Sequence, residues 1–366
     1  MIALRIGILT FHRCINYGSY WQARCLVEGL RARGHDVVIL DHHSRAINLA
    51  EWKCALRPDP GLASPEADFS ALRAKMQRFF HAIDALPLSK RFPLDRPQDV
   101  EPCDVVVVGS DEVWNRSHPW YGRCGLFYGD GIRTDRLVAY AASFGNHDAG
   151  CGLDPESTAK LRRFDVISVR DDNSRALVER AIGYSPDVVL DPCLQFPIEP
   201  TTGEDEGDVS NARSPYVALY GHGFSDAFAT RVRHWAKRRG LPVVSIGYRN
   251  HWADAQWLAA GPHEFADFIA GAQAVATNFF HGCVFALRNR KPFVCEASWY
   301  RGNKLRGLMA SVGGERHLLA HDAGPDACDP LLDAPPDARV FERIARLRDT
   351  SWRYLDLALQ PQARLA

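Results

Sequence analysis

A histidine and several cations surround two short apolar runs in residues 278–304, which read NFFHGCVFALRNRKPFVCEASWYRGNK. His281 follows the apolar run AVAT, and Arg301 and Lys304 follow the run PFVC. Free imidazole has a pKa of about 6.5, so His281 can donate or accept a proton near neutral pH. Gly282 beside it would leave room for a ligand at the backbone. The segment therefore indicates proton transfer next to a bound, strongly anionic ligand.

Several other apolar runs of the chain also end in polar residues. Arg170 follows DVISV, and Asp111 follows VVVVGS. The planar guanidinium of Arg170 can bind a carboxylate or a phosphate through two parallel hydrogen bonds, and Asp111 can act as a second base. His281, Arg170 and Asp111 are the predicted catalytic residues. The residues predicted to bind substrate are Lys304, Arg301, Asn16, Tyr17, Ser110, Asn115, Ser143, Asn278 and His222.

The elements that must position these residues alternate between short apolar runs and helical patterns. Residues 4–11 form an apolar run, residues 23–30 place apolar side chains at helical spacing, and residues 36–41 form the next run. Short apolar strands separated by helices are typical of a parallel sheet flanked by helices, which makes the fold class α/β. Further runs of this kind begin at residues 104, 136, 165, 187, 216, 242, 274 and 291.

The length of 366 residues exceeds the usual size of a single hydrophobic core. Residues 201–214, TTGEDEGDVSNARS, are acidic and small and have the composition of a linker. We therefore predict one Rossmann-like domain over residues 1–200, an acidic linker over 201–214, a second Rossmann-like domain over 215–335 and a C-terminal helical segment over 336–366. Ligands of such sheets bind at the carboxyl ends of the strands, so the two domains would face a cleft.

The charge balance argues against a nucleic-acid-binding protein. Lys plus Arg number 44, as do Asp plus Glu, so no net field favours nucleic acid as a partner.

The first residues do not read as a secretory leader, and no run reaches the ~18 apolar residues of a membrane helix. We expect a cytoplasmic protein without an integral membrane segment. Peripheral attachment to the inner membrane and homo-oligomer formation stay open.

The sequence offers little to a metal ion. Ten cysteines are scattered without a C-x-x-C pair, which indicates neither a zinc ribbon nor a redox pair. The stretch LDHH, residues 40–43, contains two histidines, but neighbouring histidines on a loop seldom converge on one ion. We therefore predict no metal site.

Short sequence motifs at the strand ends also match those of one protein family, in the same order along the chain. The segments are NYGSYWQA at 16–23, VGSDEVWN at 108–115, YAASFG at 140–145, SVRD at 168–171, VLDP at 189–192, FHG at 280–282, KPF at 291–293 and RGNK at 301–304. In this order they resemble the polysaccharide pyruvyl transferases. Each segment is short, but together they span most of the chain.

The resemblance implies a GT-B-like glycosyltransferase architecture, with the acceptor on the N-terminal domain and the donor on the C-terminal domain. It implies transfer of a pyruvyl group from phosphoenolpyruvate to hydroxyls of a sugar, glycan or lipid-linked saccharide, with formation of a pyruvate ketal and release of phosphate. Phosphoenolpyruvate would be the donor substrate, and no cofactor is implied. Trp21 and Asn278 depart from the pattern of the family, which leaves the acceptor open.

Two other functions fit the same residues. One is a GT-B-type glycosyltransferase whose nucleotide-sugar donor places its diphosphate on the same cations, and it predicts binding of a nucleoside diphosphate in preference to phosphoenolpyruvate. The other is a non-catalytic family member in a biosynthetic complex, which predicts that His281→Ala is tolerated.

Overall fold

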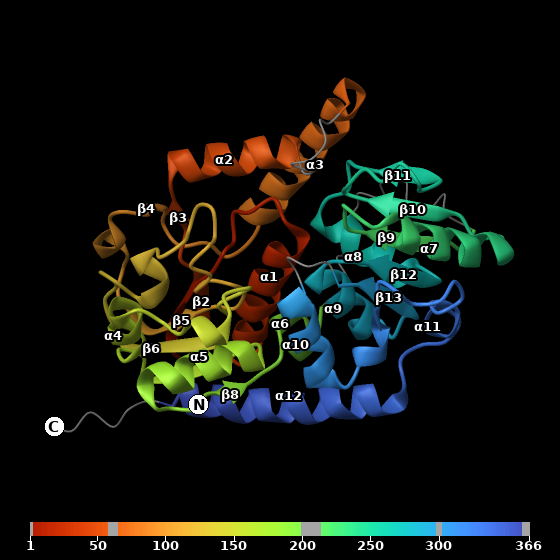
Figure 1. The fold of residues 1–366 in the computed structure, drawn as a ribbon. Helices are drawn as coiled ribbons and strands as arrows, with labels where there is room; N and C mark the ends of the chain where they lie inside the picture. The colour runs from red at the N-terminus through yellow and green to blue at the C-terminus, as the bar shows by residue number, and fades with distance from the viewer. Residues whose placement is uncertain (1–2, 58–64, 199–213, 298–301, 361–366) are drawn as a thin grey trace.

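Two parallel sheets with helices packed against them make up the structure, a computed structural model that describes residues 3–57, 65–198, 214–297 and 302–360 (Figure 1). Residues 201–213 of the predicted linker lie outside the described residues, and so does Arg301. The sheets lie side by side with helices between them (Figure 1). The predicted α/β architecture of two Rossmann-like units that face a cleft is confirmed.

The first sheet has the order β2-β1-β5-β6-β7-β8, and all its neighbouring strands are parallel. Its inner strands are nearly continuous apolar runs because both of their faces are buried, as residues 105–108 show with exposures of 2% or less. Each strand coincides with a run predicted from the sequence. The strands are β1 (Arg5–Leu9), β2 (Asp36–Ile39), β5 (Cys103–Val108), β6 (Thr134–Ala142), β7 (Val166–Val169) and β8 (Asp187–Val188), and a separate pair is β3 (His42–His43) with β4 (Phe92–Pro93).

The second sheet repeats this plan with the order β11-β10-β9-β12-β13-β14, again parallel throughout. Its four inner strands were predicted. The edge strands β11 and β14 were not, because the short segments around them do not read as apolar runs. The strands are β9 (Val217–Tyr220), β10 (Val243–Ile246), β11 (Ala255–Trp257), β12 (Ala274–Thr277), β13 (Phe293–Glu296) and β14 (Leu318–Leu319).

The first long helix, α1, begins where Asn16 in extended conformation accepts a hydrogen bond from the backbone N–H of Ser19. This cap turns the chain from the end of β1 into a helix that packs against the sheet. No helix among the described residues is long and apolar enough to cross a lipid bilayer. The helices are α1 (Tyr17–Arg31), α2 (Arg45–Leu56), α3 (Phe69–Asp84), α4 (Pro155–Leu161), α5 (Asp172–Ile182), α6 (Pro192–Gln195), α7 (Asp226–Arg238), α8 (Pro262–Gly271), α9 (Phe280–Arg288), α10 (Gly302–Val312), α11 (Asp329–Asp333) and α12 (Ala338–Ala358).

Helix α1 of the first unit packs against α8 and α9 of the second. The indole Nε1 of Trp21 donates to the carbonyl of Pro262 at 2.8 Å, and the hydroxyl of Tyr17 donates to the carbonyl of Ala260 at 2.7 Å. The Tyr17 ring also stacks on Phe265, with ring centroids 4.5 Å apart. This buried contact holds the two sheets in a defined relation, so side chains from both can form one site.

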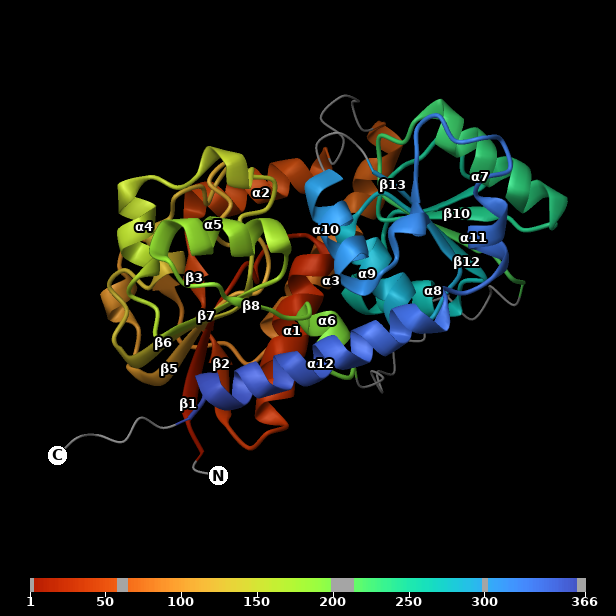
Figure 2. The same ribbon diagram turned by 60° about the horizontal axis from the view of Figure 1, so that its bottom comes forward.

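Helix α12 returns from the second unit to the first and runs along both (Figure 2). Its Tyr354 hydroxyl donates to the carbonyl of Ala139 in β6 at 2.6 Å, and its Ser351 hydroxyl accepts from the backbone N–H of Leu190 at 2.9 Å. The helical segment expected from residue 336 onward therefore packs on the unit that lies far from it in sequence.

Candidate active site

A cavity of about 330 Å³ lies at the carboxyl ends of the two sheets and is lined by both units. Such sheets collect ligands at this edge, because the loops there carry the polar side chains. The structure brings together six of the predicted site residues on its wall, namely Asn16, Asp111, Arg170, His222, His281 and Lys304.

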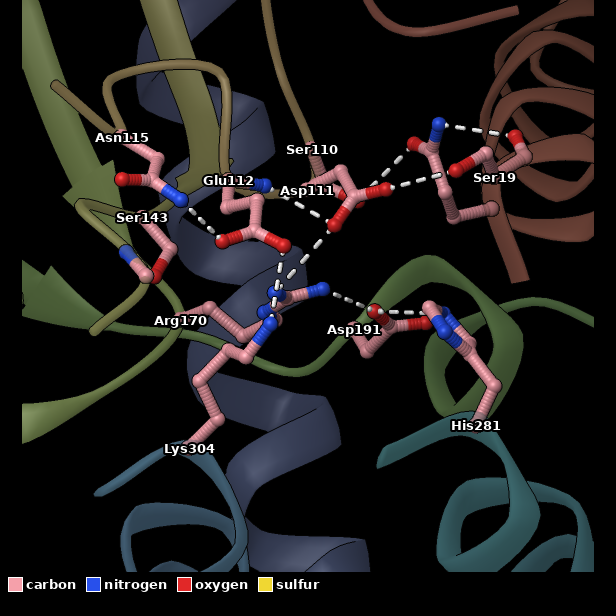
Figure 3. Close-up of polar contacts among 12 residues, drawn as sticks. Ser19, Ser110, Asp111, Glu112, Asn115, Ser143, Arg170, Asp191, His281 and Lys304 are labelled. Atoms are coloured by element: carbon pink, nitrogen blue, oxygen red, sulfur yellow. Dashed lines mark hydrogen bonds and ion pairs between the residues drawn. The ribbon is translucent and has the colours of Figure 1, made fainter. Parts of the chain in front are cut away.

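Arg170 lies at the centre of the charged side of the cavity (Figure 3). It directly follows β7, and its Nη1 donates to Asp191 at 3.0 Å while its Nη2 lies 3.4 Å from Asp111. The guanidinium also stacks over the ring of Phe280, 4.2 Å from its centroid. Burial alone would lower the pKa of Arg170, but Asp111 and Asp191 raise it above its usual value. The guanidinium is therefore a fixed, fully charged donor.

Asp111 follows β5 and is held in place by several donors. Its carboxylate accepts from the hydroxyl of Ser19 at 3.1 Å and from the backbone N–H of Glu112 at 2.8 Å. Burial would raise the pKa of this carboxyl, but Arg170 and other nearby cations lower it below its usual value. Asp111 therefore lies beside Arg170 as a charged carboxylate, and its role as a second base stays a prediction.

His281 lies in the first turn of α9, which starts three residues after the end of β12. Its Nε2 is 3.5 Å from the Asp191 carboxylate, and its side chain is 10% exposed. Asp191 also accepts from the backbone N–H of Cys193. Burial would raise the pKa of Asp191, but His281 and Arg170 lower it well below its usual range. One carboxylate thus faces both the imidazole and the guanidinium.

Gly18 of the NYG segment makes room for the imidazole. A Cβ atom on Gly18 would lie 1.9 Å from Nδ1 of His281, closer than any real contact. Gly282 has a different role from the one predicted: a Cβ there would lie 2.0 Å from Oγ1 of Thr277, inside the packed junction of β12 and α9. The prediction that Gly282 admits the ligand was wrong, because the space that it leaves is filled by the protein.

Lys304, in the first turn of α10, reaches across the cavity from the second unit. Its Nζ lies 2.8 Å from Oε1 of Glu112, and Glu112 also accepts from the amide of Asn115 at 2.7 Å. This ion pair joins the two units across the wall of the cavity (Figure 3). The two cations, Arg170 and Lys304, therefore come from different units and border one cavity.

A sequence profile of the polysaccharide pyruvyl transferases matches residues 16–300. The chain belongs to the polysaccharide pyruvyl transferase family. No curated protein sequence matched the chain. The family assignment covers the segments that carry His281, Arg170 and Asp111.

Solved structures similar to this family member have low sequence identity to it. UDP-GlcNAc 2-epimerase from Methanocaldococcus jannaschii has a TM-score of 0.50 and 12% identity over 95% of this chain and 100% of that chain. The epimerase from Neisseria meningitidis bound to UDP-GlcNAc has a TM-score of 0.49 and 10% identity over 98% and 95%. AviGT4, a glycosyltransferase involved in avilamycin A biosynthesis, has a TM-score of 0.46 and 15% identity over 97% of this chain and 97% of that chain. The first of these shows the fold alone, which is GT-B-like.

Five of the residues predicted to bind substrate do not line the cavity in this family member. They lie behind it and support its wall. The Ser143 hydroxyl donates to Asp171 at 2.7 Å, and the Asn278 amide donates to the carbonyl of His222 at 2.8 Å. Tyr17 belongs to the contact between the units. The five residues are Tyr17, Ser110, Asn115, Ser143 and Asn278.

Polar side chains on the cavity wall that were not predicted as site residues include Ser19, Glu51, Lys75, Glu112 and His118. Asp191, which contacts both Arg170 and His281, was also missed. Asp191 had a signal, since it ends the run DVVL in the same way that Asp111 ends VVVVGS. Lys75 had none, because it lies within a helical pattern of α3.

Three potential metal ligands, Asp191, Cys193 and His281, have donor atoms within 4.8 Å of one another. The Asp191 carboxylate is engaged by Arg170, whose charge would repel a cation at this place. Burial raises the pKa of the Cys193 thiol, which disfavours the thiolate that binds metals. The set fits a metal poorly, and the absence of a metal stays a prediction.

Both histidines of the LDHH stretch contact backbone carbonyls, His42 that of Thr10 and His43 that of Phe92 at 2.9 Å. Asp41 accepts from His12 at 3.0 Å and from Arg13 at 2.7 Å. His42 lies 3.1 Å from the carbonyl of Thr10, and burial lowers its pKa to about 3. These groups form a buried polar network near the end of β1.

Proposed function

We propose that the protein transfers the pyruvyl group of phosphoenolpyruvate to two hydroxyls of a saccharide, forming a ketal and releasing phosphate. The observation that carries this proposal is the convergence of Arg170 and Lys304, from opposite units, on one cavity with His281. Phosphoenolpyruvate carries a carboxylate and a phosphate on three carbons, so it needs two cationic anchors close together. Membership of the family supports pyruvyl transfer in general.

The two cations keep donors for a ligand. A guanidinium has five N–H groups, and the bonds of Arg170 to Asp191 and Asp111 use one on each terminal nitrogen. The ammonium of Lys304 has three, of which one points to Glu112. We assign one anionic group of the donor to each cation. The same charges would stabilise the phosphate as its bond to C2 breaks.

The reaction needs proton transfers that balance. The methylene carbon C3 gains a proton and becomes a methyl group, C2 forms bonds to two acceptor oxygens, and the bond between C2 and the phosphate oxygen breaks. Each hydroxyl loses a proton, so one replaces the proton given to C3 and the other leaves with phosphate. We assign these proton transfers to His281, because its imidazole lies on the cavity wall beside Asp191.

Arg170→Lys tests the donor site. The substitution keeps the charge but removes the planar fork, so we expect the affinity for phosphoenolpyruvate to fall by about 1–3 kcal/mol in calorimetry. The matched control is Arg175→Lys in α5, where the arginine pairs with Asp172 at the surface. Unchanged affinity in Arg170→Lys, or tighter binding of a nucleoside diphosphate by the wild type, would contradict a phosphoenolpyruvate site.

His281→Gln tests the proton chemistry. General acid or base catalysis contributes about 10²- to 10⁴-fold, so turnover should fall by that factor while affinity for phosphoenolpyruvate is largely kept. Single-turnover phosphate release measures the first quantity and calorimetry the second. His251→Gln is the control, because His251 is exposed and does not line the cavity. A wild-type rate in His281→Gln would make the histidine structural.

A further inference from the structure

Lys75 is a buried cation on a wall of the cavity that the proposed donor site does not use. We call this side the α2–α3 wall; it consists of Glu51, Cys54, Ala55 and Lys75. Lys75 is 4% exposed, and its Nζ donates to the carbonyl of Gly247 at 3.1 Å. Its ammonium lies over the rings of Tyr17 and Tyr248, at 4.8 and 4.7 Å from their centroids. These neighbours are neutral.

No carboxylate forms an ion pair with Lys75 in the described part of the chain. Burial lowers the pKa of Lys75 to about 7. Lys160 shows the ordinary arrangement, with Glu156 at 2.8 Å and Asp130 at 3.1 Å. A charge that is buried without a partner is costly, since the carbonyl and the rings replace only part of its hydration. A ligand that brings a negative charge would remove this cost.

Glu51 lies on the same wall and, like Lys75, forms no ion pair among the described residues. Burial raises the pKa of its carboxyl, which is bonded to the Cys14 thiol and the backbone of Ile15 but to no cation among the described residues. No ion pair joins Glu51 to Lys75. The wall therefore offers a cation to an anionic group and a carboxyl to hydroxyl groups. Acidic and phosphorylated saccharides carry both an anionic group and hydroxyl groups.

We propose that the α2–α3 wall is the acceptor subsite and that Lys75 binds an anionic group of the acceptor saccharide, either a phosphate ester or a carboxylate. Glu51 accepts a hydrogen bond from a hydroxyl of the same molecule. The inference rests on the proposed function, because it assigns the Arg170 side of the cavity to the donor. It narrows the acceptor to an anionic saccharide.

The test measures binding of three probes by calorimetry, with and without saturating phosphoenolpyruvate. Glucose 1-phosphate carries a phosphate ester, glucuronate a carboxylate, and methyl glucoside no charge. We expect the wild type to bind at least one anionic probe about tenfold or more tighter than methyl glucoside, as a charged hydrogen bond provides. The probe that binds tighter distinguishes phosphate from carboxylate. Lys75→Met should lose this preference and keep its affinity for phosphoenolpyruvate within about twofold.

Lys53→Met is the control, because Lys53 is an exposed lysine of α2 that does not line the cavity. Lys75→Gln replaces Lys75→Met if the latter does not fold. Equal affinity of the wild type for charged and neutral probes overturns the proposal, and so does a preference that survives in Lys75→Met. Loss of phosphoenolpyruvate affinity in Lys75→Met would place Lys75 at the donor and also overturn it. If the wild type binds no phosphoenolpyruvate, the proposed function fails, whereas the probe preference without donor still decides the role of Lys75.

Discussion

The Arg170 side of the cavity holds its charges in pairs, whereas the α2–α3 wall holds Lys75 and Glu51 without ion pairs in the described part of the chain. On the first side Asp111 and Asp191 flank Arg170, and Glu112 meets Lys304. On the second side the neighbours of Lys75 are a carbonyl and aromatic rings. Both sides border the same cavity, so burial alone does not explain the difference.

The pKa shifts follow this division. The pKa of Arg170 is raised and that of Asp111 is lowered, so pairing favours the charged forms against burial. The pKa of Lys75 is lowered and that of Glu51 is raised, so burial there favours the neutral forms. The ion pairs on the Arg170 side hold its side chains in position without a ligand. On the α2–α3 wall no ion pair among the described residues opposes the effect of burial on Lys75, so under the acceptor proposal its charge is compensated by the ligand.

Removal of Asp191 should have the largest effect, because it breaks the paired side. In Asp191→Ala the buried Arg170 keeps one ion pair among the described residues, the 3.4 Å contact with Asp111, and His281 loses the neighbouring carboxylate. Breaking a buried pair from one partner costs about 3–5 kcal/mol in the free energy of unfolding. Urea unfolding measures this loss, and phosphate release measures the accompanying fall in turnover.

Asp172→Ala is the matched control, since Asp172 pairs with Arg175 at the surface of α5. We expect a change within about 0.5 kcal/mol there. A loss in Asp191→Ala no greater than in Asp172→Ala would mean that the paired side does not depend on its central carboxylate, and the comparison between the two sides would fail.

Lys75→Met should act in the opposite direction and make the free protein more stable near pH 7. The folded pKa of Lys75 is about 7 because of burial, and the ordinary value for an unfolded lysine is about 10.4. Below pH 7 both states are charged, and the full cost of the buried ammonium is present. Between these pH values the unfolded chain binds one more proton, so wild-type stability rises with pH by at most about 1.4 kcal/mol per unit relative to Lys75→Met.

The difference between the two proteins should therefore be greatest below pH 7 and should fall as the pH rises towards 10. Urea unfolding at a series of pH values measures it, and the comparison cancels the titration of other groups. The groups facing the ammonium are the rings of Tyr17, Phe79 and Tyr248 and the carbonyl of Gly247. Lys53→Met should show no such slope. A pH-independent difference would mean that Lys75 is not charged at a cost in the folded protein.

The paired side was largely predictable from the sequence, whereas the α2–α3 wall was not. Arg170, Asp111 and His281 follow apolar runs, and parallel strands bring their carboxyl ends to one edge of a sheet. The same rule also selected Ser110, Ser143 and Asn278, which lie at strand ends but are turned into the protein. The position of a residue at a strand end does not determine the direction of its side chain, nor which loop covers that side chain.

Lys75 illustrates what a strand-end rule omits. It lies in the middle of α3, and its place on the cavity depends on how α3 packs over the second unit, where the carbonyl of Gly247 follows β10. That contact joins residues 172 positions apart in the chain. Local periodicity carries no information about such a contact, since a lysine in a helix is ordinarily solvated.

The smallest effect is expected at Ser110, which directly precedes Asp111 but lies behind the cavity. Ser110 is fully buried, and its hydroxyl donates to the amide oxygen of Gln22 at 3.0 Å. Ser110→Ala should lower the free energy of unfolding by about 1–3 kcal/mol, because the buried amide oxygen of Gln22 loses its donor. Turnover and affinity for phosphoenolpyruvate should stay within about twofold, because no bond to a ligand is lost.

Asp111→Asn is the informative partner of Ser110→Ala, since the two positions are adjacent and only Asp111 lines the cavity. It removes a charge beside Arg170, so it should weaken the paired side and lower turnover well beyond the effect of Ser110→Ala. Urea unfolding, calorimetry and phosphate release on both variants separate support of the wall from contact with the substrate. If Ser110→Ala lost turnover as strongly as Asp111→Asn, the serine would have to reach the ligand, and the boundary drawn here between the cavity wall and the residues behind it would be misplaced by one residue.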